Sequence, residues 1–126
     1  MLNWILFAII VGTLGWMGFN YIRVRRAAKV VDNAEFSDMI RQGQLIDLRD
    51  PADFRRKHIL GARNIPSQQL KTSLGAIRKD KTVLLYENSR GQRVMNAAIL
   101  LKKQGYQNIY ILSTGLDGWK GKIKSE

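Results

Sequence analysis

The chain has 126 residues, which is enough for one domain of ordinary size with terminal extensions. It contains no cysteine, and this excludes disulfides, thiolate nucleophiles, thiolate metal ligands and persulfide carriers within the chain. The formal net charge is +11 at pH 7, but residues 2–22 carry no charged side chain and all 21 Lys and Arg residues follow them. The charge pattern therefore separates an apolar N-terminal segment from a basic remainder.

Residues 2–22 predict one transmembrane helix. Fifteen of these 21 residues are apolar and three more are glycine, and a helix of this length spans about 30 Å, the thickness of a bilayer's hydrocarbon core. A cleaved signal peptide would have positive charge before the apolar run and a small-residue cleavage site after it. Here the positive charges follow the run, so we predict an uncleaved anchor over residues 1–22 and a basic juxtamembrane linker over residues 23–30.

The linker sets the predicted orientation of the anchor. Short flanking segments rich in Lys and Arg stay on the cytoplasmic side of a membrane. We therefore expect a single-pass protein of the cell membrane, with its N-terminus outside and the rest of the chain in the cytoplasm. Membrane lipid is expected to contact residues 2–22 and four basic side chains behind them, Arg23, Arg25, Arg26 and Lys29.

The rest of the chain alternates between strand and helix patterns. Short apolar or β-branched runs predict buried strands, and longer amphipathic stretches predict helices. The strands are expected at Gln44–Asp50, Thr82–Glu87 and Asn108–Leu112, and the helices at Asn33–Gly43 and Arg93–Gly105. This alternation predicts an α/β domain with helices on both faces of a sheet, in which ligands bind at the carboxyl ends of the strands.

Cap and face signals support both helices. Asp32 or Asn33 can cap the start of the first helix, and Gly43 can end it. The second helix places four small or apolar residues on one face, Val94, Ala97, Ala98 and Leu101. The basic residues outside the linker are scattered among acids and do not alternate with exposed aromatics, so no nucleic acid binding is expected.

The segment Asn88–Arg93, here called the 88–93 loop, joins the second strand to the second helix. Backbone N–H groups, the positive end of the helix dipole and two arginines, Arg90 and Arg93, would favour a small anion or an acidic partner group there. A structural role fits the same residues, with Arg93 paired to a local acid and Gly91 making the turn. The neighbouring Glu87 is expected to pair with Arg90 or Arg93.

Two ordered motifs resemble the rhodanese-like family over residues 31–122. The stretch LIDLRDPADFRRKHILGARNIP, residues 45–66, resembles the first signature of that family, and GYQNIYILSTGLDGWK, residues 105–120, resembles its closing signature. The resemblance implies an α/β three-layer sandwich with a mostly parallel sheet, followed by a C-terminal tail over residues 123–126.

The resemblance also implies a lost active site. The family's active loop begins with a catalytic cysteine, followed by glycine three residues later and arginine five residues later. Gly91 and Arg93 match this frame, and the cysteine position falls on Asn88, whose neutral amide has no useful nucleophilicity. A serine mechanism at Ser89 would need a base, and the sole histidine, His58, lies in a motif that is mainly structural in the family.

Four other residues are expected to be structural. Asp47 and Arg49 form a charge pair that orients the loop, His58 is a hydrogen-bonded turn residue, and Trp119 belongs to the core. No metal site is expected, because His58 has no second ligand nearby in sequence, and no cofactor is expected.

These observations predict a membrane-tethered, catalytically inactive rhodanese-like module. It would bind a membrane or membrane-proximal protein through the 88–93 loop, whose residues are Asn88, Ser89, Arg90, Gly91, Gln92 and Arg93. Two alternatives remain open at this point. One is a sulfurtransferase that works without cysteine, and the other is a sensor of a small anion such as a sulfur oxyanion or phosphate.

Overall fold

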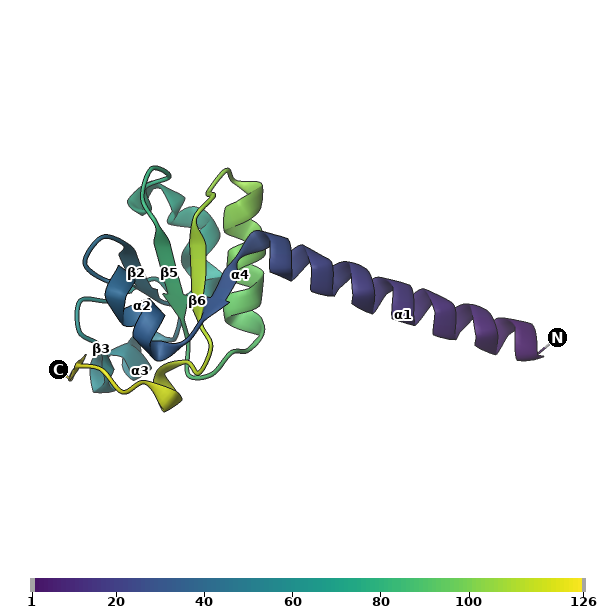
Figure 1. Cartoon of the computed structure of the whole chain (residues 1–126), viewed down its shortest axis with the longest axis horizontal. Coiled ribbons are helices and arrows are strands. Elements are labelled where there is room, and N and C mark those ends of the chain that lie inside the picture. Colours follow the sequence, from purple (N-terminus) through teal and green to yellow (C-terminus); the bar gives the residue numbers. More distant parts are fainter. Residues whose placement is uncertain (1, 126) are drawn as a thin grey trace.

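A long N-terminal helix projects from a small α/β domain (Figure 1). The structure is a computed structural model that describes residues 2–125, without the side chains of residues 2 and 23–26. Helix α1 spans Leu2–Ala27, and its segment Asn3–Ile22 is long and apolar enough to cross a membrane, with none of it buried inside the protein. The side chains of Arg23, Arg25 and Arg26, expected to contact lipid, lie outside the described residues.

The domain is built on a five-stranded sheet with the order β1-β6-β5-β2-β4. Every pair of neighbouring strands in it is parallel, which confirms the predicted mostly parallel sheet. A second, antiparallel sheet pairs β3 with β7. The strands are β1 (Lys29–Val31), β2 (Gln44–Asp47), β3 (His58–Ile59), β4 (Arg63–Asn64), β5 (Val83–Tyr86), β6 (Ile109–Leu112) and β7 (Ile123–Lys124).

Helices cover both faces of the five-stranded sheet, as predicted. In Figure 1, α2 and α4 lie on opposite sides of the sheet. The domain helices are α2 (Asn33–Met39), α3 (Pro51–Arg56) and α4 (Gln92–Lys103), and short 3₁₀ turns follow at η1 (Ser67–Thr72), η2 (Leu74–Ala76) and η3 (Leu116–Gly118). Asp32 caps α2 by accepting a hydrogen bond from the Glu35 amide at 2.9 Å.

Two hydrophobic clusters form the core, one on each face of the sheet. The four α4 residues predicted to share a face are all buried in the first cluster. Ala27 and Ala28 belong to the same cluster, and α1 contacts α4. Residues 23–30, expected to form a linker, therefore contain the end of α1 and most of β1, and they join the apolar segment of α1 directly to the domain core.

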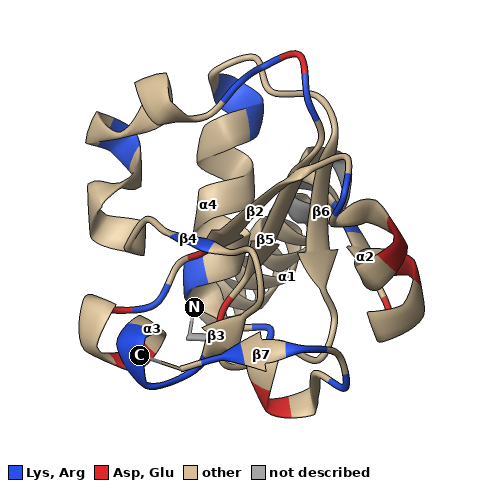
Figure 2. Cartoon of the chain, turned by 90° about the vertical axis from the view of Figure 1, so that its left-hand side faces the viewer, with Lys and Arg blue, Asp and Glu red and all other residues tan. Residues whose placement is uncertain are grey.

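Charged side chains are spread over the domain surface. Figure 2 shows Lys and Arg on α3, β7 and several loops, with acidic residues between them. The basic residues therefore do not gather on one element of the face seen in that view.

A tight turn after β6 places the 88–93 loop. Gly115 has a φ of 64° and a ψ of −170°, a region that only glycine populates readily. A Cβ at this position would overlap the carbonyl group of Asn88. Two backbone amides that follow the turn form hydrogen bonds with the start of the loop. Leu116 N donates to the Glu87 carbonyl at 2.8 Å, and Asp117 N donates to the Asn88 carbonyl at 3.0 Å.

We expect Gly115→Ala to lower the free energy of unfolding by about 2 kcal/mol or more, because the backbone strain adds to the overlap with Asn88. The measurement is urea unfolding of the full chain in detergent micelles. The matched control is Gly75→Ala in η2, where an added Cβ meets open space and the expected change is about 0.5 kcal/mol or less. Equal losses in the two variants would contradict the close packing of the turn against the loop.

Candidate functional site

A buried ion pair lies at the carboxyl end of β2. Asp47 is 0% exposed and Arg49 is 5% exposed. The Arg49 Nε donates to both Asp47 carboxylate oxygens at 3.1 Å, its Nη2 donates to Oδ2 at 2.8 Å, and its backbone N donates to Oδ1 at 2.8 Å. Burial lowers the pKa of Arg49, but hydrogen bonding and the charge of Asp47 outweigh this effect, so the pKa is raised and the guanidinium stays charged.

The same guanidinium reaches the 88–93 loop. Arg49 Nη1 donates to the Asn88 side-chain oxygen at 3.1 Å, and Nη2 donates to the carbonyl oxygen of Lys57. Arg49 therefore ties the residue at the expected nucleophile position to β2 and to the chain entering β3. These contacts connect the Asp47–Arg49 pair to the loop.

Tyr86 is a site residue that the sequence reasoning missed. It is the last residue of β5, directly before Glu87, and it is 0% exposed. Its hydroxyl oxygen accepts a hydrogen bond from the Ile59 amide at 3.1 Å. Burial, followed by the negative charge of Asp47, raises the pKa of Tyr86, so the hydroxyl stays protonated at physiological pH. The sequence signal that could have identified Tyr86 is a tyrosine at the end of an otherwise aliphatic strand.

His58 lies in strand β3 and not in a turn, so that part of its prediction was wrong. Its Nδ1 is 2.7 Å from the Phe54 carbonyl oxygen, and its ring stacks on the Phe54 ring with centroids 3.8 Å apart. Between residues 2 and 125, no hydrogen bond joins His58 to Ser89, and no cluster of three His, Cys, Asp or Glu side chains could hold a metal ion. Its contacts give His58 a packing role.

Glu87 occupies the place at the start of α4 where an anion was expected. Its Oε2 accepts a hydrogen bond from the Val94 amide at 2.8 Å, in the first turn of the helix, and the carboxylate lies beside Gly91. The expected pairing of Glu87 with Arg90 or Arg93 is wrong, since no ion pair joins them in the described part of the chain. The carboxylate instead satisfies a free helix amide and the positive end of the dipole.

The two loop arginines have different surroundings. Arg93 Nη2 is 4.0 Å from Asp50 Oδ2, and both side chains are about half exposed, so the local pairing foreseen for Arg93 is present but weak. Arg90 instead lines a groove between α1 and α4. The loop therefore does not bring its arginines together on one small ligand.

Trp119 lies at the edge of the core and not inside it. It is half-buried, and its ring meets Phe36 edge to face at 6.0 Å with an interplanar angle of 81°. Its Nε1 donates to the Lys122 carbonyl at 3.3 Å. The predicted core role thus holds only in part, because Trp119 packs against the core but is only partly buried.

The arrangement can bind but offers little for covalent chemistry. Asn88, Ser89, Arg90, Gln92 and Arg93 are exposed, and they present amide, hydroxyl and cationic groups. The chain has no cysteine. One amide of the first turn of α4, that of Val94, already has an internal carboxylate partner.

Known proteins share the fold and much of the sequence. The BH2092 protein from Bacillus halodurans matches with a TM-score of 0.70 over 88% of this chain and 85% of its own, at 19% sequence identity, which shows the fold alone. The uncharacterized protein YqhL of Bacillus subtilis is 42% identical over 127 residues, covering 100% of this chain and 99% of YqhL.

One of the relatives is a named enzyme. The thiosulfate sulfurtransferase GlpE of Tolumonas auensis is 32% identical over 78 residues, which cover 60% of this chain and 71% of GlpE. The family model for the rhodanese-like domain matches residues 32–122. This match spans most of the chain and includes the buried ion pair, the 88–93 loop and the turn at Gly115, and the chain therefore belongs to the rhodanese-like domain family.

Proposed function

We propose that this protein is a membrane-tethered, catalytically inactive rhodanese-like module that binds a partner protein through its 88–93 loop. The observation that carries the proposal is Asn88, which stands at the nucleophile position in a chain without cysteine and whose side chain is bound by Arg49. Sulfur transfer through a persulfide needs a thiolate, and an amide cannot replace it.

The exposed groups of the loop favour a protein partner. Ser89 and Arg93 lie on the open surface, and the weak ion pair of Arg93 with Asp50 can exchange for a partner's carboxylate. Charged and polar groups spread over a rim give selectivity and fast association with an acidic protein surface. An anchor in the same membrane would raise the effective concentration of the module near membrane proteins.

The small-anion alternative is less well supported. A sulfur oxyanion or phosphate at the start of α4 would lie close to the Glu87 carboxylate, which already accepts the Val94 amide. Repulsion by that carboxylate would also lower the affinity of the site for anions. The sulfurtransferase alternative has no thiol to carry the sulfur.

We expect the full chain in detergent micelles to form no thiocyanate from thiosulfate and cyanide above background, because no thiolate is present. The assay is colorimetric detection of thiocyanate, with the GlpE enzyme of Tolumonas auensis as the positive control. Turnover by the unaltered chain that exceeds the enzyme-free rate would contradict the inactive assignment.

Replacing Glu87 tests whether its carboxylate caps α4 and takes the place of an external anion. We expect Glu87→Ala to lower the free energy of unfolding by about 1 kcal/mol, because α4 loses a cap, and Glu87→Gln to cost less, since its amide oxygen can still accept the bond. We also expect sulfate to raise the melting temperature of Glu87→Ala more than that of the unaltered chain. Equal stabilisation of both proteins by sulfate would favour the small-anion alternative.

We expect a photo-crosslinking residue in place of Ser89 to capture one discrete protein in the native membrane, because Ser89 and Arg93 are both exposed in the same loop. Mass spectrometry would identify the adduct. The adduct should weaken in Arg93→Ala and persist in the matched control Arg78→Ala, whose side chain pairs with Asp80 away from the loop. A folded, membrane-inserted protein that gives no protein adduct would contradict the proposal.

A further inference from the structure

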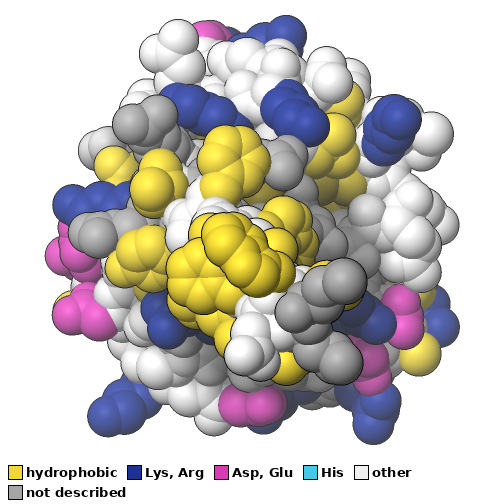
Figure 3. All heavy atoms as spheres, turned by 90° about the vertical axis from the view of Figure 1, so that its right-hand side faces the viewer, with side chains coloured by type: hydrophobic (Ala, Val, Ile, Leu, Met, Phe, Trp, Pro, Cys, Tyr) yellow, Lys and Arg dark blue, Asp and Glu magenta, His cyan; other side chains and the backbone are white. Residues whose placement is uncertain are grey.

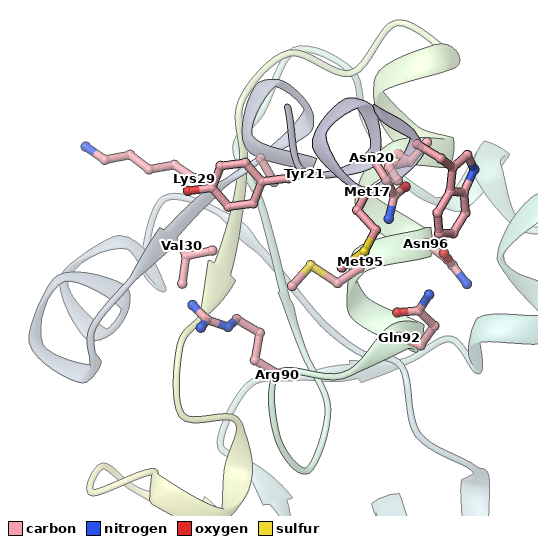
Figure 4. Close-up of a pocket in the computed structure, with 12 residues that line it drawn as sticks. Met17, Asn20, Tyr21, Lys29, Val30, Arg90, Gln92, Met95 and Asn96 are labelled. Atoms are coloured by element: carbon pink, nitrogen blue, oxygen red, sulfur yellow. The ribbon is translucent and has the colours of Figure 1, made fainter. Parts of the chain in front are cut away.

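A groove separates the end of the anchor helix from the start of α4. Its volume is about 1070 Å³, and its walls come from α1, from the segment that enters β1, and from the 88–93 loop with α4. Figure 4 shows Met17 of α1 and Met95 of α4 pointing toward one another across it, while the Arg90 side chain extends toward Val30. The groove therefore joins the membrane segment to the loop of the candidate site.

The groove lies where the protein would meet the membrane surface. Its α1 wall, which includes Trp16, Met17 and Tyr21, forms the last two turns of the segment Asn3–Ile22 that can span a bilayer. Trp16 and Tyr21 are 67% and 61% exposed, and aromatic residues of this kind favour the boundary between headgroups and acyl chains. Figure 3 shows the hydrophobic side chains of α1 in the centre, with Lys and Arg side chains on several sides around them.

The chemistry of the groove changes along its length. Trp16, Met17, Met95 and Ile99 supply apolar surface that continues along the exposed side of α1. Arg90 supplies positive charge at the other end, and no Asp or Glu is among the described lining residues. Lys29 also lines the groove, but its ammonium points away from it in Figure 4 and lies 3.9 Å from Glu35.

We propose that this groove binds one anionic phospholipid. Its phosphate would lie at Arg90, and the part of an acyl chain nearest the headgroup would lie along Met17 and Met95. A lipid matches an apolar wall that opens into the bilayer and a single cationic end at the headgroup level. A protein segment could bind without an apolar groove wall that continues onto the exposed apolar side of α1. The basic residues directly after the span, Arg23, Arg25 and Arg26, add attraction for anionic lipid by their position in the sequence.

This site goes beyond the proposed partner binding and divides the loop between two ligands. Arg90 would contact lipid, and Ser89 and Arg93 would remain available to a protein. A bound lipid would then hold the α4 side of the domain against the membrane surface.

The test is native mass spectrometry of the full chain released from micelles that contain phosphatidylglycerol or phosphatidylcholine with matched acyl chains. We expect phosphatidylglycerol to be retained preferentially, and Arg90→Gln to reduce its retention about fivefold, the factor of one cation near a membrane surface. The control Arg55→Gln removes the same charge from α3, away from the groove, and should retain phosphatidylglycerol as the unaltered chain does.

Other outcomes would overturn the proposal. Equal retention of the two lipids, or unchanged retention in Arg90→Gln, would show that Arg90 does not select the headgroup. Competition by glycerol phosphate at equal concentration would show that a soluble phosphate, and not a lipid, is the ligand. A photo-crosslinker at Gln92, which lines the groove, should capture lipid, and capture of a protein there would assign the groove to a protein instead.

Discussion

The buried ion pair between Asp47 and Arg49 is the interaction on which the site depends. One guanidinium connects the end of β2, the chain before β3 and the side chain of Asn88. Removing either partner of such a pair leaves a charge buried without compensation, which typically costs about 3–5 kcal/mol. The position of residue 88 is therefore set by the core of the domain and not by the loop alone.

An internal carboxylate lies at the start of the helix that follows the loop. In a rhodanese-like domain, the start of the helix after the loop is a natural place for negative charge, because free amides and the helix dipole point toward it. Here Glu87 supplies that charge from within the chain. The side chains of Asn88, Ser89, Arg90, Gln92 and Arg93 are exposed around this internal carboxylate.

The connection between α1 and the domain limits how the two can be oriented. Ala27 and Ala28 are buried in the same cluster as the inner face of α4, so the end of α1 is packed into the domain. A flexible linker would let the domain sample many orientations, whereas a packed helix end restricts them. Arg90 then lies on the α1 side of the loop and Arg93 on the side of Asp50.

The sequence by itself determined the absence of a thiol, the apolar span, the α/β alternation and the buried face of α4, because these depend on residue identity and on local periodicity. The tertiary structure alone decided the partner of Glu87, the separation of Arg90 from Arg93 and the partly buried position of Trp119. These features depend on where α4 begins and on what packs against each side chain. Such contacts join residues from different elements, and no local pattern encodes their geometry.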